Sequence, residues 1–480
     1  MNQRATLRPA MQISLVIGLV LLLVGIGVLD WAIPKRTLRA SPPPPVSAVA
    51  AADVESSAWY CAGGTGPAGS AVATLDLVNT TDHRTTGSMS VVTDAGASRT
   101  SAVTLAPRAA ETVVPSKILS GAGVAASLQF EGGGVLVSQT VDGPNGWSAA
   151  PCAGTTSPYW YFASGSTEPG HVLSVALFNP SAATAVVDLS FITPHGVLEP
   201  QLFEGVVVPA GGLTVEPIGA YVQDQSAIST VVHARTGHIV ADETETASAS
   251  GASGLSLRLG VPATERVWVL PRSVDTVGGT TTVSIFNPGL LPEHVVVRVR
   301  LASGSVAPFA KTLLGQSTWV LDASAQVRIP KGVSYSTLVR ATGPGVVVDR
   351  RVVSGSASAA PQFGAQNALA VGDLGPTQIL AAPGTRADPA VAGAGADALG
   401  LANVGTGRVA VTVSSVAGGV LGRVVIAPGS YSVIGAGALR GLHRRALIVR
   451  ADGPVAAMAD LGPTGSPGVV ALGAVQIEAG

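Results

Sequence analysis

Side chains that can bind a metal ion come together at one place in the sequence. His233 and His238 precede Asp242 and Glu243, and imidazole and carboxylate groups are common metal ligands. His238, however, takes the turn position at which two later parts of the chain have proline. Because that position favours the turn of a β-hairpin, we predict no metal site and no cofactor.

Acidic side chains are the next group that could do chemistry, because a pair of carboxyl groups can hydrolyse a glycosidic bond. The densest acidic group is Asp242, Glu243 and Glu245. On a strand, these residues are predicted to form a solvated face. The sequence also lacks the G-x-S-x-G motif, in which a strained turn exposes a nucleophilic serine. We predict no catalytic residue, although a pair of carboxylates from remote positions stays open.

The chain has two cysteines, Cys61 and Cys152. Two thiols are too few for a structural zinc site. In an oxidising compartment they would form a disulfide that closes a loop of roughly 90 residues and stabilises the fold by about 4–5 kcal/mol. We predict this disulfide; two unrelated buried thiols are the alternative.

Three tryptophans lie at matching places along the chain: Trp59, Trp160 and Trp268. Exposed indole rings can stack on sugars, so these residues are the candidate ligand contacts. Their repeated placement favours packing inside or between structural units, because large aromatic rings contribute strongly to protein cores.

Composition excludes one class of partner and indicates a fold class. Lys and Arg total 28 against 29 Asp and Glu, so the chain offers no basic footprint for nucleic acid. Glycine (59) and proline (33) are abundant among many valines and threonines. Short strands joined by turns have this composition, because β-branched side chains suit a pleated sheet while Gly and Pro interrupt it. We predict an all-β protein.

The N-terminal region has the character of a membrane anchor. Residues 13–29 carry no charge and, with the residues to 33, have the length of a short transmembrane helix. We predict a cytoplasmic tail at 1–12, an uncleaved signal anchor at 13–33 and a proline-rich linker at 34–55. A cleaved signal peptide is the alternative. The short leading tail and the cysteine pair favour an extracytoplasmic position for the bulk of the chain.

Internal repetition divides the remaining chain. A strand-like segment that ends in asparagine recurs four times, and a glycine follows each asparagine at a similar distance. The asparagines are Asn79, Asn179, Asn287 and Asn403, and the glycines are Gly96, Gly196, Gly304 and Gly418. We predict four β repeats, at residues 56–155, 156–262, 263–375 and 376–480.

Each repeat has room for about seven short strands in roughly 100 residues, which is the size of an immunoglobulin-like β-sandwich. The predicted fold is therefore four tandem β-sandwich (Ig-like) repeats after one transmembrane helix. A β-propeller-like arrangement is the competing architecture, since counting strands does not determine how they pair.

Residues 160–165, 177–180 and 208–211 resemble repeats of secreted actinobacterial proteins. The layout of anchor, proline-rich spacer and four divergent repeats resembles an actinobacterial family of membrane-anchored secreted proteins of unknown function. This resemblance implies a location at the cell membrane and no particular activity.

Taken together, these features predict a membrane-anchored extracytoplasmic scaffold or interaction protein of the bacterial cell envelope that is not an enzyme. Its expected partners are the membrane, through the N-terminal helix, and cell-wall polymer or envelope proteins. A carbohydrate-binding or wall-modifying protein is the alternative.

Overall fold

A computed structural model describes residues 47–63, 71–249, 252–354, 361–381, 398–435, 446–461 and 470–478. The predicted tail (1–12) and signal anchor (13–33) lie outside these residues. No helix within the described ranges is long and apolar enough to cross a membrane. The described chain is all-β, as predicted, and its strands fall into four groups, here called modules 1 to 4.

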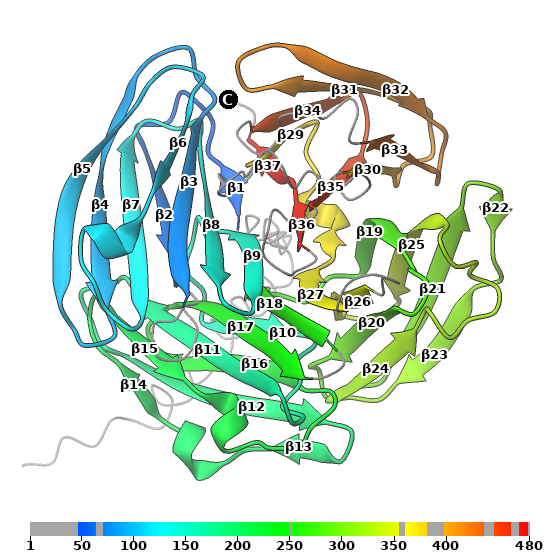
Figure 1. Cartoon of the computed structure of the whole chain (residues 1–480), viewed down its shortest axis with the longest axis horizontal. Helices are drawn as coiled ribbons and strands as arrows, with labels where there is room; N and C mark the ends of the chain where they lie inside the picture. The colour runs from blue at the N-terminus through cyan, green and yellow to red at the C-terminus, as the bar shows by residue number, and fades with distance from the viewer. Residues whose placement is uncertain are drawn as a thin grey trace, which may run out of the picture. The chain divides into compact units, whose positions relative to one another are not determined.

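Module 1 (residues 56–151) has two antiparallel four-stranded sheets with the orders β2-β7-β4-β5 and β6-β3-β8-β9 (Figure 1, blue and cyan). The 3-10 helix η2 (Pro115–Lys117) lies between β6 and β7. The strands are β2 (Ser56–Cys61), β3 (Val72–Asn79), β4 (Thr85–Thr93), β5 (Ser98–Leu105), β6 (Ala110–Val113), β7 (Val124–Glu131), β8 (Val135–Gly143) and β9 (Gly146–Pro151).

Module 2 (residues 159–259) repeats this pairing, with β10-β16-β12-β13 in one sheet and β15-β11-β17-β18 in the other, while β14 pairs with β12. Its short helices are η3 (Gln201–Phe203) and η4 (Ile218–Ala220). The strands are β10 (Tyr159–Phe162), β11 (His171–Asn179), β12 (Ala185–Thr193), β13 (Gly196–Leu198), β14 (Val206–Val208), β15 (Gly212–Glu216), β16 (Ser229–Thr236), β17 (Val240–Ala249) and β18 (Ala252–Leu259).

Module 3 (residues 267–370) has the orders β22-β21-β25-β19-β28 and β27-β26-β20-β24, while β23 pairs with β21. Because β27 pairs in parallel with β18, one sheet of module 2 and one of module 3 form a continuous eight-stranded sheet. The strands are β19 (Val267–Val274), β20 (Thr280–Asn287), β21 (Glu293–Leu301), β22 (Gly304–Ser305), β23 (Phe309–Leu313), β24 (Ser317–Asp322), β25 (Ser334–Ala341), β26 (Val347–Ser354), β27 (Gln362–Asn367) and β28 (Leu369–Ala370).

Module 4 (residues 377–473) follows the 3-10 helix η5 (Val371–Asp373) and has the orders β29-β34-β31-β32 and β33-β30-β35-β36. Two further strands, β1 (Ala48–Val49) and β37 (Val475–Ile477), extend its first sheet. The other strands are β29 (Thr377–Leu380), β30 (Ala398–Asn403), β31 (Val409–Ser415), β32 (Val420–Ile426), β33 (Tyr431–Gly435), β34 (Leu447–Ala451), β35 (Val455–Leu461) and β36 (Val470–Gly473).

The strand β1 corrects the predicted linker. Residues 48–49 were assigned to the spacer 34–55, but they pair in parallel with residues 476–477, and Val49 is fully buried. The small side chains that suggested a spacer instead let this segment pack beside module 4. The end of the predicted linker is therefore part of the folded chain.

Hydrophobic alternation builds the core of each module. Along β12 the buried positions alternate with half-buried ones, as expected for a strand with one face on a core. In module 2, Val187 and Leu189 of β12 pack in one cluster with Val175 and Leu177 of β11, which belongs to the other sheet. The two sheets of the module thus share a core. Each module has eight to ten strands, more than the predicted seven, because short edge strands such as β13 and β22 escape a pattern search.

The four repeated asparagines end the second strand of each module and stabilise the turn that follows. Asn79 Nδ2 donates to the carbonyl oxygen of His83 at 2.8 Å, and its Oδ1 accepts from the N–H of Thr81 at 2.9 Å. The other three donate in the same way, each at 2.8 Å to the carbonyl four residues later: Asn179, Asn287 and Asn403. The repeated glycines also adopt positive φ: Gly96, Gly196, Gly304 and Gly418. The predicted turns are therefore confirmed.

Candidate functional site

The two cysteines form the predicted disulfide. Cys61 ends β2 and Cys152 follows β9, with a Cα–Cα distance of 4.8 Å and a sequence separation of 91. Both residues are buried. Because β2 and β9 belong to different sheets, the bond joins the two sheets of module 1.

The three tryptophans are core residues, which corrects their assignment as candidate ligand contacts. No more than 2% of any of these residues is exposed. Each indole Nε1 donates to a backbone carbonyl: Trp59 to Val135, Trp160 to Ile239 and Trp268 to Val346. A buried ring whose N–H already has a partner cannot stack on a sugar.

The acidic group on β17 is also placed differently from the prediction. Asp242, Glu243 and Glu245 are fully buried, so the predicted solvated face is wrong. Alternation within one strand could not show that a neighbouring module covers these side chains. His233 lies apart from them and stacks on Tyr159 with ring centroids 4.3 Å apart. In the described parts of the chain no three His, Cys, Asp or Glu side chains are placed to hold a metal ion.

Asp242 connects module 2 to module 1. Its Oδ2 accepts from the N–H of Ala62 at 3.2 Å and from the side-chain amide of Gln139. Burial raises the pKa of Asp242 to about 7, although these hydrogen bonds act in the opposite direction. A carboxyl group of module 2 thus binds the chain of module 1 directly after strand β2.

Asp349 makes the equivalent connection from module 3 to module 2. It pairs with Ser284 in the β20–β26 ladder, as Asp242 pairs with Ala176 in the β11–β17 ladder. Its Oδ2 accepts from the N–H groups of Ala163 and Ser164, at 2.8 and 3.0 Å, directly after β10. We call Asp242 and Asp349, with the N–H groups they accept from, the aspartate latches.

The junction of modules 3 and 4 lacks both halves of such a latch. Pro271, within β19, stands three residues after Trp268, as Ala62 and Ala163 stand after Trp59 and Trp160, and proline has no N–H to donate. Met458, paired with Gly400, takes the aspartate position. Here Asp460 of module 4 instead forms ion pairs with two arginines of module 3, Arg272 and Arg350, the latter at 3.1 Å.

The latch at modules 2 and 3 continues into a buried ion network. Arg258 of β18 donates to Glu243 of its own module and, at 2.9 Å, to Asp349 of module 3. All three side chains are at most 2% exposed. Burial raises the pKa of Glu243 to about 8, although Arg258 favours its ionised form. The network therefore holds two carboxyl groups around one guanidinium.

Glu245 belongs to a second, more strongly ionised group. It accepts from His171 Nδ1 at 2.8 Å, and both terminal nitrogens of Arg351 donate to it, one at 2.7 Å. Burial alone would raise the pKa of Glu245, but Arg351 and His171 outweigh it and lower the pKa to about 2. The Arg351 guanidinium also lies over the ring of Phe363, 4.8 Å from its centroid.

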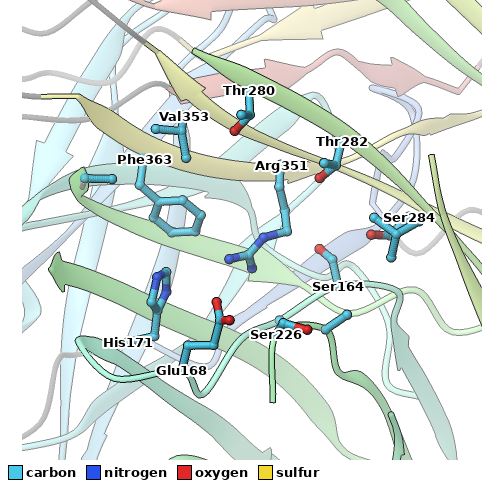
Figure 2. Close-up of a pocket in the computed structure, with 14 residues that line it drawn as sticks. Ser164, Glu168, His171, Ser226, Thr280, Thr282, Ser284, Arg351, Val353 and Phe363 are labelled. Atoms are coloured by element: carbon cyan, nitrogen blue, oxygen red, sulfur yellow. The ribbon is translucent and has the colours of Figure 1, made fainter. Parts of the chain in front are cut away.

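Above this group lies a cavity of about 290 Å³ between modules 2 and 3 (Figure 2). Strand β20 of module 3 lines one side with the hydroxyl groups of Thr280, Thr282 and Ser284. Glu168 and His171 of module 2 line the opposite side, and Arg351 points between them. The cavity thus brings together acidic, basic and hydroxyl groups of two modules, and it is our candidate binding site.

The comparison with protein families matches a model of a family of unknown function (DUF5719) to residues 124–427, more than half of the chain. The chain belongs to this family. The match includes all of modules 2 and 3, and with them every residue of the cavity. No curated protein matches the chain.

Solved structures show only distant likeness. A Thermotoga maritima protein designated 1070 is 14% identical and covers 22% of this chain and 95% of its own, with a TM-score of 0.20. The Anabaena sensory rhodopsin transducer is 18% identical, with 18% and 92% covered and a TM-score of 0.16. A tetra-tandem repeat of a large adhesion protein is 12% identical, with 83% and 93% covered and a TM-score of 0.12. TM-scores this low do not indicate a common fold.

Sequence analysis missed three charged residues of the junction between modules 2 and 3. Arg258, Asp349 and Arg351 were not singled out, although each stands in a strand of otherwise apolar or small residues. The segment 347–353 carries three consecutive charged residues between valines, where a solvated face would alternate. Consecutive charges on a buried strand are the signal that could have identified this junction.

Proposed function

We propose that this protein is a non-catalytic scaffold or interaction protein of the bacterial cell envelope, held at the membrane by residues 13–33. We further propose that each of the four modules is an immunoglobulin-like sandwich. We also propose that the protein comes from an actinobacterium. In this role the four modules would form a rigid support that exposes loops and sheet edges to binding partners.

One observation carries this proposal: the acidic and basic side chains that could have formed a catalytic centre connect neighbouring modules instead. Asp242 and Asp349 accept hydrogen bonds from backbone N–H groups of the preceding module. Arg258 neutralises the charge of Asp349. Buried groups of this kind fix one relative arrangement, because leaving any of them unpaired costs stability. A fixed arrangement is what presentation requires.

The disulfide supports the extracytoplasmic part of the proposal, because disulfides persist in oxidising compartments. The test is fractionation of cells that make the full chain. We expect the protein in the membrane fraction, digested by protease added outside spheroplasts, with both cysteines resistant to thiol labelling until reduction. A cytosolic protein with free thiols would contradict the location.

The non-catalytic part needs its own test. Incubation of the full chain with purified envelope polysaccharides, followed by product analysis, should yield no cleavage. Reproducible cleavage that is lost on replacing carboxylates of a single module would instead establish the wall-modifying alternative.

Glycan binding is the second candidate function, and one surface favours it. Tyr159, 40% exposed, lies parallel to Tyr161 with ring centroids 6.1 Å apart, and stacks on His233. Retention on purified cell wall, lost in Tyr159→Ala but kept in the matched control Tyr221→Ala, would support it. Tyr221 is a suitable control because it is 57% exposed and belongs to the same module.

A further inference from the structure

The cavity between modules 2 and 3 has features that module docking does not explain. Strand β20 directs three hydroxyl side chains into it, at alternate positions and therefore on one face of the strand: Thr280, Thr282 and Ser284. None of these three hydroxyl groups makes a side-chain hydrogen bond within the described part of the chain. Ser284 is buried, Thr282 is half-buried and Thr280 is exposed, so the hydroxyl row runs from the floor of the cavity to its mouth.

The hydroxyl row is absent from the equivalent strand of module 2. The equivalent positions of module 2, in register on β11, are Val172, Ser174 and Ala176, with one hydroxyl among them. The two modules share the latch geometry but not this row. The hydroxyl groups are therefore not needed to dock one module on another.

The neighbouring strand β26 and the opposite wall supply complementary groups, because Arg351 pairs with Thr282 in the β20–β26 ladder and Glu168 lies across the cavity. Arg351 uses two of its nitrogens on Glu245, and a guanidinium carries five N–H groups, so donors remain for a ligand. Glu168 of module 2, exposed at the mouth, is an acceptor on the opposite side. Phe363, Val353 and Ala252 add apolar surface. Donors, acceptors and apolar surface therefore all face one space.

The charges around the cavity select the kind of ligand. The positive charge of Arg351 is matched by buried Glu245, and Glu168 adds a negative charge at the mouth. The Glu168 carboxylate would repel an anionic ligand, and the Arg351 guanidinium would repel a cationic one. A neutral ligand with many hydroxyl groups meets neither repulsion and can both donate and accept. The volume, about 290 Å³, is close to the lower end for small-molecule pockets, ~300 Å³.

We infer that this cavity binds a neutral polyhydroxylated ligand of about the size of one sugar ring, with Thr282, Arg351 and Glu168 as its main polar contacts. The inference adds a binding site to the proposed scaffold and does not depend on it. It is also separate from the Tyr159 surface, which lies on the other sheet of module 2.

The test uses the full chain and saturation-transfer NMR with the methyl glycosides of glucose, galactose and mannose, beside methyl glucuronide and methyl glucosaminide as charged probes. We expect millimolar binding of at least one neutral glycoside and at least tenfold weaker binding of its charged counterparts. Binding should weaken about tenfold in Thr282→Val and in Glu168→Ala, since each loses one hydrogen bond. Thr312→Val, an exposed strand threonine of the same module, should bind normally.

Circular dichroism and thermal unfolding of each variant establish that it is folded before binding is compared. The inference is overturned if no neutral glycoside binds, if the glucuronide binds more tightly than the neutral sugars, or if Thr282→Val binds normally. Loss of binding in Tyr159→Ala with normal binding in Thr282→Val would likewise overturn it, and would move the site to the Tyr159 surface.

Discussion

The junction of modules 2 and 3 and that of modules 3 and 4 join equivalent surfaces by different chemistry. At the first, Asp349 accepts two backbone N–H groups and one guanidinium hydrogen bond, all in a fully buried place. At the second, the backbone donor is missing at Pro271, and Asp460, whose side chain is 11% exposed, binds two arginines. One fold therefore offers two ways to connect a carboxylate of one module to the next.

The difference shows that donor and acceptor are present or absent together. Where the chain after the first strand has an N–H, as at Ala62 and Ala163, an aspartate of the next module faces it. Where proline removes that N–H, methionine replaces the aspartate. A buried carboxylate opposite proline would have no donor and would cost stability. We conclude that the aspartate of one module and the backbone N–H it faces in the preceding module form one unit.

The largest expected effect concerns module 1, where the latch residue Ala62 directly follows the disulfide. Replacing both cysteines with alanine should lower the free energy of unfolding by about 4–5 kcal/mol in the chain-entropy model. Hydrogen exchange should show the loss in module 1 and at its junction with module 2. Unchanged protection there, with a loss confined to module 4, would contradict the assignment.

Removing the buried cation should separate the two junctions. Arg258→Met leaves Glu243 and Asp349 without a counter-ion and should cost about 3–5 kcal/mol in denaturant unfolding. Arg272→Met at modules 3 and 4, where Arg350 still pairs with Asp460, should cost about 1–2 kcal/mol. The double variant Glu243→Leu, Arg258→Met should recover part of the loss. Equal losses in both single variants would remove the distinction between the junctions.

Acidity should stabilise the folded chain through Asp242, because protonation removes the cost of burying its charge. The folded pKa of Asp242, about 7, lies above its ordinary value of 3.8, so between these values the folded chain holds a proton that the unfolded chain releases. The free energy of unfolding should therefore fall as pH rises from about 4 to 7, by about 4 kcal/mol. Denaturant unfolding of Asp242→Asn across this range should show a flatter dependence. Parallel curves would contradict the raised pKa.

The smallest effect is expected at an exposed ion pair of module 2. Arg235, with a side chain 52% exposed, pairs with Asp188 on the outer face of the module. Arg235→Ala should change the free energy of unfolding by less than about 1 kcal/mol, because exposed pairs are well screened. A loss as large as that of Arg258→Met would show that burial does not set the difference.

Sequence alone determined the all-β class, the repeated asparagine turns and the disulfide. The strands follow from the alternation of β-branched residues, and the turns follow from an asparagine that hydrogen-bonds to its own turn. The disulfide follows because each of the two cysteines has only the other as a partner. The repetition of the tryptophans favoured a core but left a ligand surface open, and only burial separates the two.

The tertiary structure alone decided where the charges lie. Asp242, Glu243 and Glu245 form an acidic stretch on both faces of β17, and nothing within this strand shows that modules 1 and 3 cover these side chains. Whether a charged side chain is solvated or buried depends on groups more than 80 residues away, such as Gln139 and Arg351. Strand periodicity is a local property, whereas desolvation is set by whichever module packs against the strand.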